Sequence, residues 1–338
     1  MDRRQPRVAV VGAGSWGTTV ASIIARKNPT VLWARSAETA EEIDTGHTNS
    51  RYLGERTVFA GLRATAELAQ AVEPADVLVM AVPSHGFRDV LVQLAPMVRP
   101  WIPVIHLVKG LEQGSRKRMS QVINDVLPGH PAGVLAGPNI AREVAGGYAA
   151  AAVIAMPDQH QAAQLRELFR TPRFRIYSAT DVDGVEIAGA LKNVFAIAVG
   201  MGDGIGAGDN TRAMVITRAL REMTRLGEAL GGHRDTFPGL AGMGDLVVTC
   251  TSPHSRNRHV GELIGRGQSI AEILAGMTQV AEGVKAASVV MKLAADAGID
   301  MPIAREVDAV VNGGSDVTRA YRGLLAVAPG HEVHGAGW

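Results

Sequence analysis

A short apolar run that ends in three glycines constrains the fold of this chain more than any other feature. Residues 8–17 read Val-Ala-Val-Val-Gly-Ala-Gly-Ser-Trp-Gly, and a helical pattern follows over residues 18–25. The apolar run predicts a buried strand. Gly12 permits a tight turn, Gly14 lets a ligand approach the backbone, and Gly17 lets the helix pack closely on the strand. This order predicts a dinucleotide-binding unit, with a purely structural glycine-rich turn as the alternative.

The start of this helix has the groups that bind a pyrophosphate. Backbone N–H groups at a helix N-terminus are free to bond an anion, and the helix dipole favours negative charge there. The hydroxyl of Ser15 can add a further bond to phosphate. Trp16 is expected on the turn itself, where exposure of its apolar ring to water is unfavourable. Either the cofactor or a second domain is expected to pack against the ring, and the residues do not decide between these two alternatives.

A cation follows the second predicted strand, in the region that reads the ribose of the cofactor. The strand covers Thr30–Trp33, and Arg35 comes two residues later. NAD-selective folds usually place an acidic residue here, whereas an arginine accommodates the 2′-phosphate of NADP. The nearest acid, Glu38, lies further along the chain. The sequence favours NADP(H), with use of NAD(H) left open and a solvated surface arginine as the alternative.

Strands and helices alternate in the first half of the chain. Continuously apolar strands are typical of a sheet covered on both faces, and strand–helix–strand order predicts a doubly wound parallel sheet. The predicted strands are Arg7–Val11, Thr30–Trp33, Val77–Val82, Val104–Val108, Gly133–Leu135, Ala152–Ala155 and Phe174–Tyr177. The predicted helices between them are Thr18–Ala25, Thr65–Gln70, Phe87–Leu94 and Met119–Val126.

The pattern changes to helices alone near Asp181. The predicted helices are Val185–Met201, Thr211–Leu230, Arg258–Gly265, Ile270–Ala275, Gly283–Ala297 and Ile303–Val311. We expect an α/β fold in which residues 1–180 form a Rossmann-type NAD(P)-binding domain with a doubly wound sheet. Residues 181–338 would form an all-helical domain that binds substrate and carries the catalytic residues.

Composition excludes several classes of protein. The formal net charge of +1 leaves no general basic excess for nucleic acid or an anionic membrane. Cys250 is the single cysteine, which excludes a disulfide framework and a cysteine-based metal cluster within one chain. We expect it to pack as a small apolar residue rather than act as a nucleophile. The apolar run Ala149–Met156 is too short to span a bilayer. These features predict a soluble, cytoplasmic protein without a metal.

Two further predicted strands end in residues that can meet a ligand. Lys109 directly follows the strand Val104–Val108, and open α/β sheets bind ligands at the carboxyl ends of their strands. Gly137, Pro138 and Asn139 form a second turn, in which Pro138 suits the first turn of a helix. The N–H groups after Gly137 suit an anion. The alternative for Lys109 is an ordinary side chain that faces solvent.

A lysine and an asparagine interrupt a helix that is otherwise apolar on nearly every face. This helix begins near Val185, and Lys192 and Asn193 lie within it. Burial lowers the pKa of a lysine toward the range of a useful proton donor, and ketone reduction needs a donor because hydride addition leaves an alkoxide. The alternative is a lysine that reaches the surface. Asp245, after a glycine-rich turn, either caps a helix or orients a lysine ammonium or a substrate hydroxyl.

A candidate phosphate site follows Asp245. Ser255, Arg256 and Asn257 offer several donors in a row, and a guanidinium can give two parallel bonds to a phosphate. The alternative is an exposed helix start with ordinary basic residues. The segment that contains Val280 and Glu282 supports no prediction from its spacing alone.

Taken together, these motifs resemble bacterial NAD(P)-dependent glycerol-3-phosphate dehydrogenases over about Val8 to Leu325. So many blocks in one order make coincidence implausible. The matching blocks are Gly12–Gly17, Val82–Ser84, Lys109–Glu112, Gly137–Pro138, Leu191–Val194, Gly202–Gly206, Gly242–Leu246, Ser255–Arg258, Val280 with Glu282 and Gly283, and Met301–Ile303.

The resemblance implies an activity and a set of roles. The enzyme would interconvert dihydroxyacetone phosphate and sn-glycerol 3-phosphate for phospholipid synthesis. Lys192 would be the general acid–base residue, with Lys109 and Asp245 beside the ketone. The implied cofactor contacts, besides the glycines of the turn, are Ser15, Trp16, Arg35, Lys109, Ala141, Arg256, Val280 and Glu282. The implied substrate contacts are Lys109, Gly137, Asn139, Lys192, Asn193, Asp245, Thr249, Ser255, Arg256 and Asn257.

The sequence departs from the family pattern at two positions, and two other functions remain open. Asn139 replaces a hydroxyl residue in the Gly-Pro turn, and Arg35 stands where relatives often have other residues. A reductase of a 3-hydroxy acid would share both halves, although the segment Ser255–Arg258 favours a phosphorylated substrate. A nucleotide sensor without catalysis is the other alternative, and the presence of Lys192, Lys109 and Asp245 argues against it. A homodimer is possible.

Overall fold

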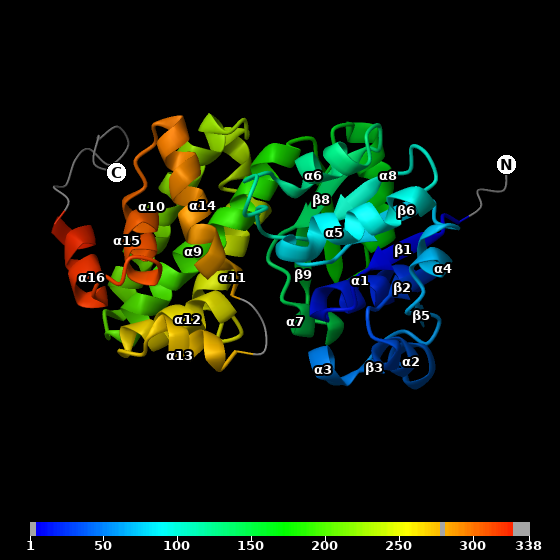
Figure 1. Cartoon of the computed structure of the whole chain (residues 1–338), viewed down its shortest axis with the longest axis horizontal. Coiled ribbons are helices and arrows are strands. Elements are labelled where there is room, and N and C mark those ends of the chain that lie inside the picture. Colours follow the sequence, from blue (N-terminus) through cyan, green and yellow to red (C-terminus); the bar gives the residue numbers. More distant parts are fainter. Residues whose placement is uncertain (1–4, 278–280, 327–338) are drawn as a thin grey trace. The chain divides into compact units, whose positions relative to one another are not determined.

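The computed structural model describes residues 5–277 and 281–326 and divides into two compact units. The first unit comprises Met1–Glu112 and Lys117–Val182, and the second comprises Gln113–Arg116 and Asp183–Trp338. Figure 1 labels the elements of both units. The first unit contains a sheet with helices, and the second is helical in its described part.

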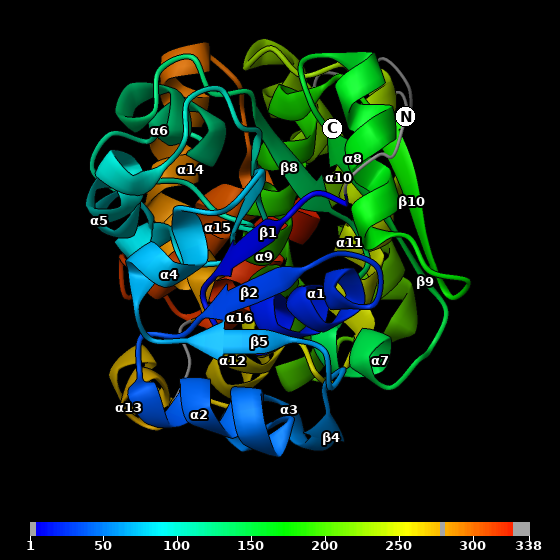
Figure 2. The same ribbon diagram turned by 90° about the vertical axis from the view of Figure 1, so that its right-hand side faces the viewer.

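The first unit is built on an eight-stranded sheet in the order β10-β9-β8-β7-β6-β1-β2-β5. Strand β1 pairs in parallel with both β2 and β6, so the strand before the glycine turn lies inside the sheet (Figure 2). The strands are β1 (Val8–Val11), β2 (Thr30–Trp33), β5 (Arg63–Thr65), β6 (Val77–Met80), β7 (Val104–His106), β8 (Ala132–Ala136), β9 (Ala150–Ala155) and β10 (Phe174–Ala179).

Helices cover both faces of this sheet, which confirms the doubly wound fold. Val8 and Val10 of β1 pack into one core, and Ala9 and Val11 pack into the other. Because successive side chains of a strand point to opposite faces, a strand covered on both faces is apolar at every position. One core includes residues of α1 (Ser15–Ala25) and α8 (Gln159–Phe169), and the other includes residues of α4 (Leu68–Val72), α5 (Ser84–Leu94) and α6 (Met119–Val126).

The prediction of a wholly parallel sheet is wrong at one strand pair. Strands β8 and β9 pair antiparallel, and β10 pairs in parallel with β9. The connection from β8 to β9 contains α7 (Ala141–Ala145), a helix of five residues. A helix of that size is about 7.5 Å long. It is too short to carry the chain back along a strand of six residues, which spans about 20 Å. The next strand therefore starts at the same edge and runs in the opposite direction.

A small excursion between β2 and β6 contains elements that the sequence does not predict. It comprises α2 (Ala37–Gly46), β3 (Thr48–Asn49), α3 (Ser50–Leu53), β4 (Gly54–Thr57) and the edge strand β5. The helix predicted over Thr65–Gln70 begins later, at Leu68. Thr65 instead pairs with Trp33 in the sheet, and its hydroxyl accepts from Glu67 N. This local bond holds a turn between strand and helix.

The second unit packs its helices around α9 (Val182–Gly204). This helix is long and apolar enough to cross a membrane by length and composition, but it is buried within the structure, as a core helix would be. The other helices are α10 (Gly208–Ala229), α11 (Asp245–Thr251), α12 (Arg256–Gly265), α13 (Ile270–Ala275), α14 (Glu282–Ala297), α15 (Pro302–Val311) and α16 (Val317–Ala326). The residues predicted to carry chemistry here lie on α9, α11, α12 and α14, apart from Ser255, the N-cap of α12, and Val280, which lies outside the described residues.

Candidate active site

The glycine turn has the shape of a pyrophosphate cradle. Gly12 has φ of +115°, and a Cβ atom there would lie 2.9 Å from the carbonyl carbon of Ala81. A Cβ on Gly17 would collide with the carbonyl oxygen of Gly12. A Cβ on Gly14, by contrast, would meet nothing within 4 Å. Helix α1 starts at Ser15 without a side-chain cap, so its first N–H groups are available to an anion.

Ser15 and Trp16 lie within the first turn of α1 rather than on a loop, so the placement expected for Trp16 is wrong. The Ser15 hydroxyl donates to the carbonyl oxygen of Tyr52 at 3.2 Å. The Trp16 ring is half-buried and packs edge-on against Phe174, with 6.0 Å between ring centroids. Its indole Nε1 is buried and has no hydrogen-bond partner among the described residues. A buried donor of this kind costs free energy unless a ligand accepts from it.

Asn49 supports the glycine turn through two hydrogen bonds, although nothing in the sequence marks it as a functional residue. Its Nδ2 donates to the carbonyl oxygen of Ala13 at 3.0 Å and to Thr18 Oγ1 at 2.8 Å. The side chain is fully buried. It lies in the short β3–α3 excursion, where no motif or periodicity marks a functional residue. The two bonds fix the turn and the start of α1 in one arrangement.

Replacing Asn49 with alanine should raise KM for NADPH and NADH alike, by about five- to thirty-fold. The change leaves the Ala13 carbonyl without its buried donor, which costs about 1–2 kcal/mol. Steady-state kinetics with both cofactors measures the effect, and thermal unfolding shows whether the variant is folded. Asn312→Ala, an exposed site at the end of α15, is the matched control. A folded Asn49→Ala variant with unchanged KM values would show that the turn needs no such support.

Arg35 is exposed directly beyond β2, and the neighbouring acid is already engaged. The Ser36 hydroxyl caps α2 and also donates to the Glu38 carboxylate. This hydrogen bond holds the pKa of Glu38 below its usual value. Glu38 is thus an ionised residue in the first turn of α2, where the helix dipole favours it. The Arg35 side chain is exposed to solvent at the end of β2, where a phosphate group of a ligand can reach it.

Lys109, Gly137 and Asn139 come together at the carboxyl ends of β7 and β8. The Lys109 ammonium donates to the Gly137 carbonyl oxygen at 2.9 Å and to Asn139 Oδ1 at 2.6 Å. Gly137 has φ of +145°, and a Cβ atom there would lie 2.9 Å from Ala152 Cα. Because Asn139 presents its oxygen to Lys109, its buried Nδ2 is left without a partner among the described residues. This amide is a donor ready for an anionic or carbonyl ligand.

The prediction that Pro138 begins a helix is wrong. Helix α7 starts three residues later, at Ala141, with Ile140 as its N-cap. In a helix that began at Pro138, the Gly137 carbonyl would accept the first intrahelical bond, but here it accepts from Lys109 instead. Ala141 is the first residue of α7, and its carbonyl oxygen accepts from the Thr19 hydroxyl of α1.

In the second unit, Lys192 is buried and bonded rather than extended to the surface. Its side chain is 5% exposed, and that of Asp245 is 2% exposed. The Lys192 ammonium donates to Asp245 Oδ1 at 2.6 Å and to Thr249 Oγ1 at 2.8 Å. Asp245 and Thr249 lie one turn apart on α11. Both residues therefore hold the Lys192 ammonium from one face of α11.

A π-helical turn sets the position of Asp245. It covers Leu240–Gly244 and leads directly into α11. A Cβ atom on Gly242 would collide with the Phe237 carbonyl oxygen, so this turn packs backbone against backbone. Turns of this type are frequent at functional sites because they redirect the residues that follow. Here the residue that follows is the carboxylate bonded to Lys192.

Asn193, Asn257 and Gly283 form a second buried cluster. Asn257 Nδ2 donates to Asn193 Oδ1 at 2.9 Å, and the Gly283 N–H donates to Asn257 Oδ1 at 3.0 Å. A Cβ atom on Gly283 would collide with the Asn193 carbonyl oxygen. Glycine at this position therefore lets the start of α14 close over the two amides. The cluster fixes the amide orientation of Asn193, the residue next to Lys192.

The residues of the predicted phosphate segment, Ser255, Arg256 and Asn257, have different environments. Ser255 is the N-cap of α12 and accepts from Arg258 N at 3.3 Å. Asn257 is tied to Asn193, as described above. Arg256, the first residue of α12, is the exposed member of the set. Glu282 is the half-buried first residue of α14.

Cys250 packs as an apolar residue, as expected. It is fully buried in α11, and burial raises the pKa of its thiol to about 12. The thiolate is the nucleophilic form of cysteine. Cys250 is therefore protonated at neutral pH and has no part in nucleophilic chemistry.

Comparison with known proteins decides the family. Residues 7–162 match the N-terminal model of NAD-dependent glycerol-3-phosphate dehydrogenase, and residues 181–322 match its C-terminal model. The chain belongs to the NAD-dependent glycerol-3-phosphate dehydrogenase family. A relative of that name with NAD(P)+ specificity, from Mycobacterium avium (strain 104), is 67% identical over 99% of this chain and 98% of its own length. Another from Sphingopyxis alaskensis is 56% identical over 97% and 98%.

Solved structures of glycerol-3-phosphate dehydrogenases have the same fold. The enzyme from Coxiella burnetii superposes with a TM-score of 0.90 at 35% identity, over 95% of this chain and 99% of that one. A ketopantoate reductase from Ralstonia eutropha reaches a TM-score of 0.59 at 17% identity, over 93% and 99%. At that identity the likeness concerns the fold alone. A Rossmann-type unit followed by a helical region is therefore shared more widely than the glycerol-3-phosphate dehydrogenase family.

Proposed function

We propose that this member of the family catalyses the NAD(P)-dependent interconversion of dihydroxyacetone phosphate and sn-glycerol 3-phosphate. The single observation that carries the proposal is the buried ion pair between Lys192 and Asp245, completed by Thr249. Burying a lysine with a carboxylate costs desolvation free energy that an apolar pair would avoid, so the pair points to a role in the reaction. We further propose that the enzyme acts in the cytoplasm and supplies phospholipid synthesis.

The chemistry requires a hydride and a proton. NAD(P)H, when bound, would supply the hydride that reduces the ketone. Lys192 then donates the ammonium proton to the oxygen that becomes the alcohol, and takes a proton back in the reverse direction. Asp245 and Thr249 hold the lysine in place. Lys109 would stabilise negative charge that develops on the bound substrate, while its bonds to Gly137 and Asn139 orient it.

The remaining residues would bind the cofactor and the substrate. The open side of the Gly14 turn and the uncapped start of α1 fit a pyrophosphate. The proposed cofactor contacts are Gly12, Gly14, Ser15, Trp16, Gly17, Arg35, Lys109, Ala141, Arg256, Val280 and Glu282, of which Val280 lies outside the described residues. The proposed substrate contacts are Lys109, Gly137, Asn139, Lys192, Asn193, Asp245, Thr249, Ser255, Arg256 and Asn257.

Oxidation of sn-glycerol 3-phosphate tests the proposed function. The purified protein with NADP+ or NAD+ should form reduced cofactor and dihydroxyacetone phosphate in equal amounts. A 3-hydroxy acid serves as the competing substrate, because a 3-hydroxy acid reductase is the alternative enzyme that the sequence leaves open. Turnover of the hydroxy acid with none of sn-glycerol 3-phosphate would contradict the proposal. Absence of turnover with both would favour a nucleotide sensor.

Cofactor preference depends on Arg35 in this proposal. Arg35→Ala should raise KM for NADPH by about 10- to 150-fold, because a hydrogen bond to a charged group contributes about 1.5–3 kcal/mol. KM for NADH should change by less than about two-fold, since NADH has no 2′-phosphate. NADH is therefore the internal control in the same variant. Equal changes for both cofactors would show that Arg35 does not contact the 2′-phosphate.

A further inference from the structure

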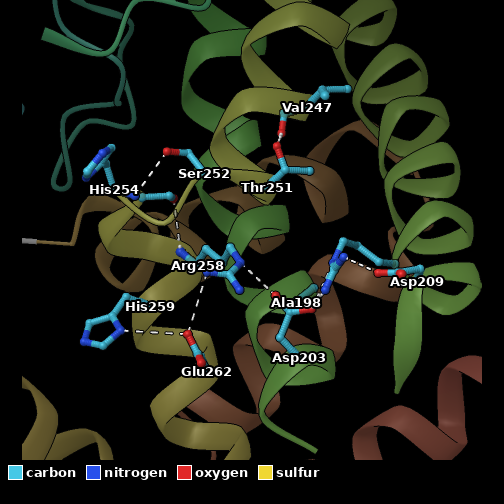
Figure 3. A network of polar contacts seen from close by, with 12 residues as sticks. Ala198, Asp203, Asp209, Val247, Thr251, Ser252, His254, Arg258, His259 and Glu262 are labelled. Atoms are coloured by element: carbon cyan, nitrogen blue, oxygen red, sulfur yellow. Dashed lines mark hydrogen bonds and ion pairs between the residues drawn. The ribbon is translucent and has the colours of Figure 1, made fainter. Parts of the chain in front are cut away.

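Arg258 lies two residues after Arg256 but has quite different surroundings. Its Nε donates to Asp203 Oδ2 at 2.7 Å, and its guanidinium lies 3.7 Å from the Glu262 carboxylate. Figure 3 shows Arg258 between these two acids. Both acids repel a phosphate, so Arg258 is unsuited to bind one itself. The side chain is instead committed to Asp203, near the end of the helix that carries Lys192.

Asp203 is a carboxylate with little exposure that is shared by two arginines. Its side chain is 9% exposed. Besides the bond from Arg258, it accepts from Arg212 Nε at 3.0 Å and from a second Arg212 nitrogen at 2.8 Å. Charge-assisted bonds of this kind are strong and directional. Asp203 thus ties α12 and the start of α10 to the end of α9.

Four glycines bring the backbones of α9 and α12 into direct contact beside this ion pair. Cβ atoms on Gly200 and Gly204 of α9 would collide with the carbonyl oxygens of Arg258 and Glu262. A Cβ atom on Gly261 of α12 would likewise collide with a carbonyl oxygen of α9. The fourth is Gly265, whose Cβ would lie 2.5 Å from the Met201 carbonyl oxygen. Arg258 is therefore held on α9 by its backbone and by its side chain.

This arrangement fixes the first turn of α12. Asn257 is bonded to Asn193 beside Lys192, and Arg258 is bonded to Asp203 further along the same helix. Successive residues of a helix point about 100° apart. Two anchored neighbours therefore determine the direction in which Arg256 leaves the helix. Without the Arg258 anchor, the first turn could rotate or fray about the Asn257 contact.

We propose that Arg258 and Asp203 are positioning residues, whose ion pair holds the first turn of α12 on α9 so that Arg256 meets the substrate phosphate. This inference rests on the proposed function, because it assumes a phosphorylated substrate bound by Arg256. In this proposal, binding of the phosphate depends on Arg258, whose side chain contacts neither the phosphate nor the cofactor. Substrate selectivity is then decided partly at the end of α9, away from Lys192.

The test compares a phosphorylated and an unphosphorylated ketone. Arg258→Gln and Asp203→Asn should each lower kcat/KM for dihydroxyacetone phosphate by about 10- to 100-fold, the cost of a small misplacement. The value for dihydroxyacetone should stay within about two-fold of wild type. The double variant should be no worse than either single one, because the two residues act as a unit. Arg258→Lys, which keeps the charge, should recover part of the loss.

Arg266→Gln is the matched control. Arg266 lies just beyond the end of α12, is exposed and pairs with the same Glu262, so this variant should behave as wild type. A folded Arg258→Gln variant with unchanged selectivity would overturn the proposal, and so would equal losses for both ketones or additive effects in the double variant. If Arg258→Gln fails to fold, Arg258→Lys and Asp203→Asn decide by the same criteria. A wild-type protein inactive with dihydroxyacetone phosphate would instead overturn the proposed function, and with it this inference.

Discussion

Replacing Lys192 with alanine should lower kcat for dihydroxyacetone phosphate by about 100- to 10,000-fold, the usual contribution of a general acid. The ammonium is the proton donor in the proposed reaction, and Asp245 and Thr249 hold it in place. Binding of NADPH, measured by fluorescence titration, should be unchanged, because Lys192 is not one of the proposed cofactor contacts. Single-turnover kinetics should show that the slow step is hydride transfer rather than product release.

Two further variants separate chemistry from folding. Removing Lys192 leaves Asp245 buried without its main cation, which costs about 3–5 kcal/mol. Lys192→Gln keeps a hydrogen-bond donor for Asp245 but cannot supply a proton at neutral pH, so it should be more stable and equally inactive. Lys285→Ala, an exposed lysine on α14, is the control and should be fully active. Near-normal turnover by folded Lys192→Ala and Lys192→Gln would refute the catalytic role.

Replacing Arg256 with alanine should lower kcat/KM for dihydroxyacetone phosphate by about 10- to 150-fold. A bond from the guanidinium to a phosphate contributes about 1.5–3 kcal/mol, and Arg256 is the exposed donor of its segment. Much of the phosphate's binding energy should serve to place the ketone for reaction. The value for dihydroxyacetone should therefore change little, and the ratio between the two substrates should fall.

The control for Arg256 is Arg305→Ala, an exposed arginine on α15. It should leave both specificity constants at the wild-type level. If Arg256→Ala preserves the ratio between the two ketones, Arg256 does not bind the phosphate. The positioning role of Arg258 would then also be wrong, because it acts through Arg256.

The sequence predicts what depends on local pattern. The strand–turn–helix at Gly12 is a continuous motif, and its three glycines follow from one tight turn. The apolar helix around Lys192 marks the lysine as buried before its partners are known, because a lone cation in such a helix is conspicuous. The sequence leaves several roles open for Asp245, and the structure shows that it accepts a hydrogen bond from Lys192.

The sequence does not predict what depends on contacts between distant segments. Asn49 supports the glycine turn from a short excursion without periodicity, so nothing local marks it. Asn257 resembles a phosphate ligand in a row of donors, yet its amide is bonded to Asn193 and Gly283. The direction of β9 is decided by the short length of α7, which the predicted strand pattern does not include. In each case, the missing information is which segment lies opposite.

The most direct test of the account is the specificity constant of the wild-type protein for dihydroxyacetone phosphate and for dihydroxyacetone, measured by NADPH oxidation. The two ketones differ only in the phosphate, and both undergo the same reduction. The account predicts rapid oxidation with the phosphorylated ketone and a specificity constant at least about 100-fold lower with the other, since the phosphate contributes several charge-assisted bonds. Equal specificity constants for the two ketones, or oxidation with neither, would contradict it.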